Sequence, residues 1–384
     1  MSIEGELYRP LGLDRRARRK RPRLPSAGAL LVAAGAVAIV WGSTEAALYG
    51  HDARRDVDVL AKPTASVRAP ATASETTVAV LAKPLAKPSG PTIISPDART
   101  GHVVFRVEDT TDYRQSPMMA HMPDPALVED SQFGPLPIRA ADGRRPFDVY
   151  RGTSSGAPAT RIAIVVGGLG ISQTGSMEAV ERLPAGVTLG FSPAGNSLDR
   201  WMQAARRGGH ELLLQAPLEP VGYPTVDPGK NTLTIAEAAA GDFTALYASL
   251  GRITNYVGVM NYMGARFTGD KAAMDPFIAE LGRRGLMYLD DGSSARTLAK
   301  DTALAAGVPA AAANVRLDES QDPAAVTKQL DMLEKVARAQ GSAIGVASAF
   351  DQSIAAIAAW IPAAEKRGIE IVPVSALAYD PESR

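Results

Sequence analysis

Short apolar runs alternate with helical patterns from Arg161 to the C-terminal end of the chain. The apolar runs predict strands at 161–166, 187–191, 210–215, 257–260, 285–290, 312–317, 342–347 and 369–374. The intervening segments predict helices at 174–183, 196–207, 239–254, 271–284, 322–340 and 353–367. Strands that are apolar throughout and alternate with helices indicate a parallel sheet buried on both faces. About seven or eight such units favour a closed or nearly closed β/α barrel over a flat doubly wound sheet.

The N-terminal part of the chain has a different pattern, a basic tip followed by an uncharged apolar run. Residues 1–23 hold eight Arg or Lys and three acidic residues, and Ala27–Ser43 carries no charge. Residues 27–49 suffice to span a bilayer, and the basic flank predicts that the N-terminus stays in the cytoplasm. We therefore expect a basic tail at 1–25 and a single transmembrane anchor at 26–49. The alternative is a signal peptide that is cleaved near Ala46.

Residues 50–157 form the third region, which is rich in Ala, Pro, Thr and Lys. Proline lacks a backbone donor and favours extended, solvated chain. We therefore predict a disordered low-complexity linker here, with one plausible strand beginning at His102. The folded domain is expected at 158–380.

Composition and charge limit the chemistry available to the chain. It has no cysteine, which excludes disulfides and zinc bound by thiolates. Of its four histidines, only His210 lies within 158–380, where it follows two glycines and is interpreted as a structural turn residue. The formal net charge is zero, but residues 1–23 have an excess of basic over acidic residues and the rest of the chain has an excess of acidic ones. This distribution argues against nucleic acid as a partner.

Three motifs occur in order along the predicted domain. They read HELLLQAPLEP at 210–220, GVMNYMGARFT at 258–268 and GLMYLD at 285–290. Together they resemble the divergent polysaccharide deacetylases of bacterial envelopes, relatives of the metal-dependent carbohydrate deacetylases. The resemblance implies a distorted (β/α) barrel of the glycoside hydrolase and deacetylase type. It also implies an inner-membrane protein whose C-terminal domain lies in the periplasm.

The chain departs from the family pattern where the metal chemistry would sit. Gly167 and Gly168 stand where the family has two aspartates, one a metal ligand and the other a base. Tyr262 replaces a ligand histidine, and Gln215 stands where the family often has a second histidine. Ala347 or Ser348 takes the place of the histidine that would protonate the leaving group. The resemblance therefore implies the fold and predicts a catalytically degenerate site without a cofactor.

Three aspartates remain at the predicted strand ends, Asp290, Asp291 and Asp318. They are the candidate catalytic groups and the candidate ligands of a divalent cation such as Mg²⁺ or Ca²⁺. The other interpretation is that they cap helices or form ion pairs. Arg266 either orients a carboxylate or pairs with Asp290 or Asp291 as scaffolding.

The glycines after the first strand, Gly167–Gly170, allow two interpretations. A Gly-Gly-x-Gly turn before a helix can cradle a phosphate, but the pattern lacks the full dinucleotide fingerprint, and a plain tight turn is favoured.

Three functions follow from these observations. The first is an active carbohydrate deacetylase with a rebuilt aspartate site. The second is a barrel that binds glycan or an envelope protein without hydrolysing it. The third is an envelope assembly factor that is tethered to the inner membrane through residues 27–49. The missing ligands favour binding. The candidate binding residues are Gln215, Asn261, Tyr262 and Arg266, because amide groups suit sugar hydroxyls and tyrosine suits stacking on a sugar face.

Overall fold

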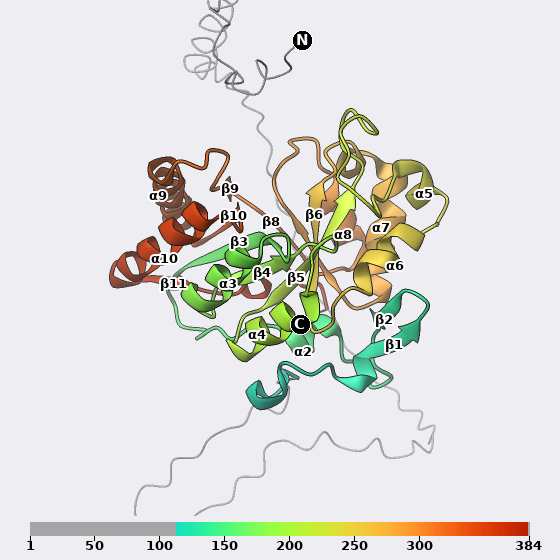
Figure 1. Ribbon diagram of the computed structural model, residues 1–384, viewed down its shortest axis with the longest axis horizontal. Helices are drawn as coiled ribbons and strands as arrows, with labels where there is room; N and C mark the ends of the chain where they lie inside the picture. Colours follow the sequence, from blue (N-terminus) through green and yellow to red (C-terminus); the bar gives the residue numbers. More distant parts are fainter. Residues whose placement is uncertain (1–112, 383–384) are drawn as a thin grey trace, which may run out of the picture. The chain divides into compact units, whose positions relative to one another are not determined.

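A sheet of nine strands lies at the centre of the described part of the chain, residues 113–382 of a computed structural model (Figure 1). Its strand order is β8-β7-β6-β5-β4-β3-β10-β9, with β11 also paired to β3, and all neighbours run parallel. The strands are β3 (Thr160–Leu169), β4 (Thr188–Phe191), β5 (Leu212–Leu218), β6 (Gly258–Met263), β7 (Met287–Asp290), β8 (Ala310–Ala312), β9 (Val315–Arg316), β10 (Ser342–Ser348) and β11 (Ile369–Ile371). The predicted parallel sheet is confirmed.

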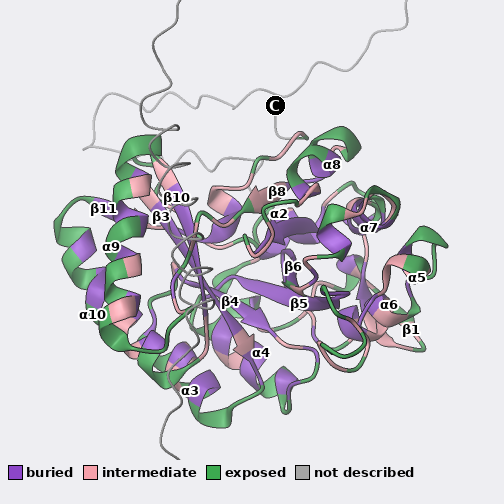
Figure 2. Ribbon diagram, turned by 90° about the horizontal axis from the view of Figure 1, so that it is seen from above, coloured by how far each residue is buried: buried purple, intermediate pink, exposed green. Residues whose placement is uncertain are grey.

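Helices surround the curled sheet and turn their exposed faces outward (Figure 2). They are α2 (Pro146–Tyr150), α3 (Gln173–Arg182), α4 (Leu198–Arg207), α5 (Ile235–Ala239), α6 (Thr244–Leu250), α7 (Lys271–Arg283), α8 (Ala299–Ala306), α9 (Pro323–Gln340) and α10 (Asp351–Lys366). Every residue of β4 and β5 is buried, as expected for a sheet covered on both faces. Within residues 113–382 no helix is both long and apolar enough to cross a bilayer. The predicted anchor at 26–49 lies outside the described residues.

The sequence predicted a closed or nearly closed barrel, and of these the closed form is wrong, because β8 and β9 do not pair with each other. The predicted strand 312–317 is instead two short strands on either side of residues 313–314. Ala313 donates its N–H to the carbonyl of Asp290 at 2.9 Å, and Asn314 donates to the carbonyl of Ile344 at 2.8 Å. The chain therefore crosses from one sheet edge to the other at this point, and the sheet is a curled ring without a hydrogen-bonded closure.

Two helix predictions also need correction. Only α6 lies inside the predicted helix 239–254, because α5 ends at Ala239 and is followed by Gly241 with a positive φ of 74°. A capping box begins α5, with Thr234 and Glu237 as its partners. Helix α8 follows Thr297 and was not predicted, since its alanine-rich sequence shows little helical periodicity.

Residues 113–157 were expected to belong to the disordered linker, and the structure contradicts this. They contain the hairpin of β1 (Val128–Ser131) and β2 (Gly134–Pro137), followed by α2. Leu127, Phe147 and Tyr150 are buried in the core beneath the sheet. Burial of apolar side chains is the main favourable contribution to folding, so this segment is part of the domain. The strand predicted at His102 lies outside the described residues.

Candidate functional site

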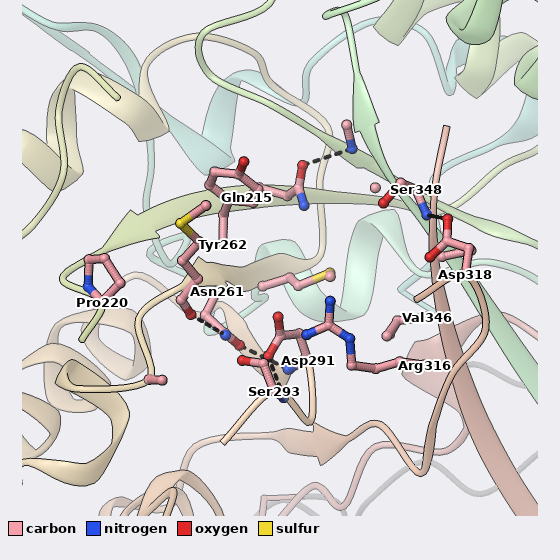
Figure 3. A pocket seen from close by; sticks show the side chains of 16 residues that line it. Gln215, Pro220, Asn261, Tyr262, Asp291, Ser293, Arg316, Asp318, Val346 and Ser348 are labelled. Carbon is pink, nitrogen blue, oxygen red and sulfur yellow. Dashed lines mark hydrogen bonds between the residues drawn. The ribbon is translucent and has the colours of Figure 1, made fainter. Parts of the chain in front are cut away.

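A cavity of about 450 Å³ opens at the carboxyl ends of the strands, where parallel β/α proteins bind their ligands. Its walls come from the ends of β3, β5, β6 and β10, from the loop after β7 and from the segment that follows β8 (Figure 3). The lining residues that bear on its chemistry are Gly167, Gly168, Gln215, Asn261, Tyr262, Asp291, Ser293, Arg316, Asp318 and Ser348. Most of the predicted site residues are therefore brought together.

Gln215 fills the space that a side chain at position 167 would need. A Cβ on Gly167 would stand 2.7 Å from Gln215 Nε2, closer than nonbonded atoms approach. The Gln215 Oε1 atom accepts a hydrogen bond from the N–H of Gly168 at 2.8 Å, drawn dashed in Figure 3. The glycine and the glutamine are thus complementary, because the amide of Gln215 occupies the space beside Gly167.

Gly168 has a backbone conformation that excludes most side chains. Its φ is +85°, and the register of β3 against β4 shifts between Val166 and Leu169. A residue with a positive φ at such a bulge is normally glycine. The N–H of Gly168 is used by Gln215, so this turn is not organised as a phosphate cradle.

Tyr262 and Asn261 follow each other on β6 but have different surroundings. Tyr262 is 41% exposed and lines the cavity, so its ring is available to a ligand. Asn261 is buried, and its Oδ1 accepts from the N–H of Asp291 at 2.9 Å and from the Tyr288 hydroxyl at 3.2 Å. Its Nδ2 donates to the carbonyl of Met263 at 2.8 Å. Asn261 therefore fixes the ends of β6 and β7 and leaves only one donor for a ligand.

The three predicted aspartates do not share one role. Asp291 and Asp318 line the cavity, whereas Asp290 does not. Asp291 accepts from the N–H of Ser293 at 2.9 Å, and Asp318 accepts from the N–H of Ser348 at 2.7 Å. Asp290 is buried and accepts from the Thr297 hydroxyl and the N–H of Gly292. Asp290 and Asp291 each accept from the N–H two residues on, in the turn after β7. The expected helix-cap role is therefore not observed for them, and the N-cap of α8 is Leu298.

The side chains at the family's ligand positions do not fit a catalytic divalent metal. Glycine supplies no ligand at positions 167 and 168, and the amide of Gln215 and the phenol of Tyr262 are poor ligands in this setting. Across residues 113–382, no group of three or more His, Cys, Asp or Glu side chains is placed to hold an ion. The alternative of a rebuilt site from Asp290, Asp291 and Asp318 is therefore not supported by their positions.

Arg266 was expected either to orient a carboxylate or to pair with Asp290 or Asp291. The pairing with Asp290 or Asp291 is wrong, because Arg266 pairs with another carboxylate. Its Nη1 lies 2.6 Å from Oε1 of Glu219. Glu219 is buried and its other oxygen accepts from the N–H of Ile235 at 2.8 Å, at the start of α5. Arg266 is not among the cavity residues. The ion pair therefore joins the loop after β6 to the loop before α5.

Sequence reasoning missed Arg316, a cationic residue of the cavity. It ends the short strand β9, is exposed, and has its nearest carboxylate at 3.9 Å, on Glu319. Figure 3 shows its guanidinium extending into the cavity between Asp291 and the Asp318–Ser348 pair. The sequence placed Arg316 inside the longer predicted strand 312–317, and nothing in that pattern indicated that it lines a cavity.

His210 lies away from the cavity, as predicted. It is buried before β5, and its Nδ1 is 2.9 Å from the carbonyl of Val187. Burial lowers the pKa of His210 below its usual value. His210 is thus a structural residue that joins two strand ends.

The buried carboxyl of Asp290 predicts a pH dependence of stability. Burial raises its pKa, against the opposing hydrogen bonds from Thr297 and Gly292. The folded state then binds the proton more tightly than the unfolded chain, so the free energy of unfolding falls as pH rises from the ordinary Asp pKa through the raised one. We expect Asp290→Asn to remove this decrease in urea unfolding measured between about pH 4 and pH 7. Asp301→Asn, an exposed carboxyl on α8, is the control. An unchanged pH slope in Asp290→Asn would contradict the assignment.

Comparison with known proteins assigns the chain to a family. The family model for divergent polysaccharide deacetylases matches residues 164–378. YibQ of Escherichia coli K12 is 25% identical over 200 residues, which are 52% of this chain and 62% of YibQ. A Haemophilus influenzae protein is 25% identical over 207 residues, which are 54% of this chain and 73% of that protein. The chain thus spans less than two thirds of the length of YibQ.

A solved structure supports the same placement. The crystal structure of ATU2773 from Agrobacterium tumefaciens C58 is similar to this chain with a TM-score of 0.62 and 55% sequence identity. The match covers 64% of this chain and 99% of that structure. The motifs at 210–220, 258–268 and 285–290 all lie inside the residues that the family model matches. The chain belongs to the divergent polysaccharide deacetylase family.

Proposed function

We propose that the domain binds a carbohydrate of the bacterial envelope in the cavity at the strand ends, without metal-dependent deacetylation. The observation that carries the proposal is the exchange at the family's catalytic positions. The positions hold Gly167, Gly168 and Tyr262, and the same strand ends form a cavity that is lined by polar side chains. A volume of about 450 Å³ lies within the range of small-ligand sites.

The polar groups of the cavity match the hydrogen-bonding needs of sugar hydroxyls, which both donate and accept. One Asp291 oxygen and one Asp318 oxygen have no partner among the described residues and are available as acceptors. Arg316 and the Nε2 of Gln215 are available as donors. Because each of these groups is held by a strand end or a strand-end loop, the arrangement is preformed.

Tyr262 adds an apolar surface to this polar set. Its ring is 41% exposed at the cavity, and aromatic rings with a polar tip suit the face of a pyranose ring, which is apolar above and below. The exchange of a ligand histidine for tyrosine therefore replaces a metal-binding group with a carbohydrate-stacking one.

We further propose that the domain works on the outer side of the inner membrane. The support is the apolar run Ala27–Ser43 behind a basic tip, which matches a single-pass anchor with its N-terminus inside. The compartment on that side is the periplasm, so the carbohydrate that the domain would meet is a glycan of the bacterial envelope. We take the curled sheet, open between β8 and β9, as a distorted form of the deacetylase-type (β/α) barrel.

Glycan retention tests the proposal. The full chain in an uncharged detergent is incubated with insoluble peptidoglycan, and the retained fraction and the released acetate are measured. We expect retention without acetate release, and about tenfold weaker retention for Tyr262→Ala and for Arg316→Gln, as for removal of a central binding side chain. Tyr379→Ala, an exposed tyrosine outside the cavity, is the matched control. Equal retention of Tyr262→Ala and the control would contradict binding at this cavity, and acetate release by the wild type would contradict the loss of hydrolysis.

A further inference from the structure

A second cavity lies at the opposite ends of the strands and has a different chemistry. It has a volume of about 300 Å³ and is lined by residues that precede β3 and β5, by the end of α4 and by the first described segment. Four of its lining residues are arginines, at positions 114, 151, 206 and 207, and none is acidic. The neutral hydrogen-bonding side chains that line it are Gln115, Ser116 and Thr153.

Arg206 is the buried part of this cavity. It is only 6% exposed, and its hydrogen bonds go to main-chain carbonyls. Its Nη1 donates to Tyr150 at 2.9 Å and to His210 at 3.0 Å, and its Nε donates to Ala120 at 3.2 Å. The Nη2 atom has no partner among the described residues, although the side chain lines the cavity. A buried guanidinium held by carbonyls keeps its positive charge and one free donor group.

Glu211 is a buried acidic residue between α4 and β5, and it does not neutralise the cavity by direct contact. Its Oε2 accepts from the N–H of Gly152 at 2.8 Å and from the Ser375 hydroxyl. Its Oε1 accepts from the N–H of Ser375 at 3.0 Å and from the Thr188 hydroxyl at 3.2 Å. These four donors surround the carboxyl, and none of them is an arginine of the cavity.

The remaining arginines add donors at the rim. Arg207 is exposed, and its Nη2 donates to Oε1 of Gln203 on the same helix at 3.2 Å. Arg114 and Arg151 have interactions of their own within the chain and still line the cavity. Ser116 and Thr153, which carry hydroxyls, line the same cavity. Guanidinium forks with hydroxyls are the groups that proteins use to bind the oxygens of a phosphate.

We propose that this cavity binds the phosphate group of a small polar molecule or headgroup, such as a glycerol phosphate. The buried Arg206 supplies the fixed charge and the free donor, and Arg207 closes the site from the solvent side. A volume of about 300 Å³ is at the small end of ligand sites, so it suits a phosphate with a short attached group. The same chemistry occurs in a soluble glycerol phosphate and in the headgroup of an anionic phospholipid. This inference is independent of the carbohydrate cavity.

Isothermal titration with the full chain in an uncharged detergent tests the proposal. The probes are inorganic phosphate, glycerol 3-phosphate, and mixed micelles that contain phosphatidylglycerol or, as the uncharged comparison, phosphatidylcholine. We expect one site per chain for at least one phosphate-bearing probe and no site for phosphatidylcholine. The variant Arg207→Gln is expected to weaken binding about tenfold, as for loss of one charge-assisted hydrogen bond. Arg200→Gln, on the same helix but outside the cavity, is expected to bind like the wild type.

The outcomes separate the two sources of the phosphate. Binding of glycerol 3-phosphate assigns a soluble ligand, and binding of phosphatidylglycerol micelles alone assigns a lipid headgroup. Arg151→Gln provides a second variant in case Arg207 contributes little. Wild-type affinity in both Arg207→Gln and Arg151→Gln would overturn the proposal, and so would the absence of binding by every phosphate-bearing probe.

Discussion

Replacement of Arg145 by methionine is expected to lower the free energy of unfolding by about 3–5 kcal/mol, the cost of breaking a buried ion pair. Arg145 is 5% exposed. Its Nε lies 2.7 Å from Asp148, and its Nη2 lies 2.6 Å from Asp380 near the C-terminal end. Methionine keeps much of the apolar stem but removes the cation that faces Asp148, Asp380 and, at 3.3 Å, Glu382. The loss would show as a lower urea midpoint with an unchanged m-value.

The pKa of Asp380 supplies a second readout of the same contact. Burial raises it, but the hydrogen bonds and charge of Arg145 outweigh burial and hold it below its usual value. A carboxyl with a depressed pKa contributes stability above its ordinary pKa and loses it as pH falls through the lowered one. The difference between the wild type and Arg145→Met should therefore shrink in acid.

Arg182→Met is the control for this experiment. Its ion pair with Glu178 on α3 is exposed, so its loss should cost about 0.5 kcal/mol. An effect of Arg145→Met no larger than that of Arg182→Met would show that the Arg145 cluster does not hold residues 113–150 to the domain.

The sequence predicts the strands of this fold well because its strands are short, apolar and separated by turns. The predicted runs at 161–166 and 342–347 fall within β3 and β10, and these two strands pair in register over seven residues. A strand that is buried on both faces is apolar at every position and does not alternate with polar residues. A continuous apolar run of strand length is therefore enough to identify it. The end of the barrel is harder, because the break at residues 313–314 depends on hydrogen bonds to β7 and β10 that are remote in sequence.

The segment 113–157 shows why a compositional argument failed. Its partners lie far along the chain, since Arg145 binds Asp380 and Phe147 donates its N–H to the carbonyl of Gly285. The local sequence has short elements, the hairpin of β1 and β2 and the five-residue α2, which carry little periodicity of their own. Such a segment folds by long-range contact, which composition does not report.

Those residues of the candidate site that lie at the ends of strands could be predicted from the sequence. Gln215, Tyr262, Asp291 and Asp318 were named from their places at the ends of runs, and all four line the cavity. Arg316 was not, since it ends a strand of two residues that the sequence merges with its neighbour. Which carboxylates point inward also depends on the turns after β7, where local hydrogen bonds hold Asp290 away from the cavity.

The triple variant Gly167→Asp, Gln215→His and Tyr262→His is expected to bind one divalent transition metal that the wild type does not retain. The three positions line one cavity, and the change supplies a carboxylate and two imidazoles, ligands that zinc prefers. Gly167→Asp alone is expected to bind no metal, because it adds a single carboxylate and requires the Gln215 amide to move, since its Cβ would stand 2.7 Å from Gln215 Nε2. Gly168 stays unchanged, since its φ of +85° would strain any side chain.

Metal content by mass spectrometry of the full chain, purified without chelators, measures this gain. The matched control carries Gly167→Asn with the same two histidines, because an amide has the size of a carboxylate but ligates metals weakly. Stoichiometric metal in the aspartate variant alone would show that the fold still presents the family's site and that side-chain exchange removed it. A triple variant without metal would instead mean that the three strand ends have separated. Stoichiometric metal in the wild type would contradict the loss of metal binding itself, and with it the carbohydrate-binding proposal in its present form.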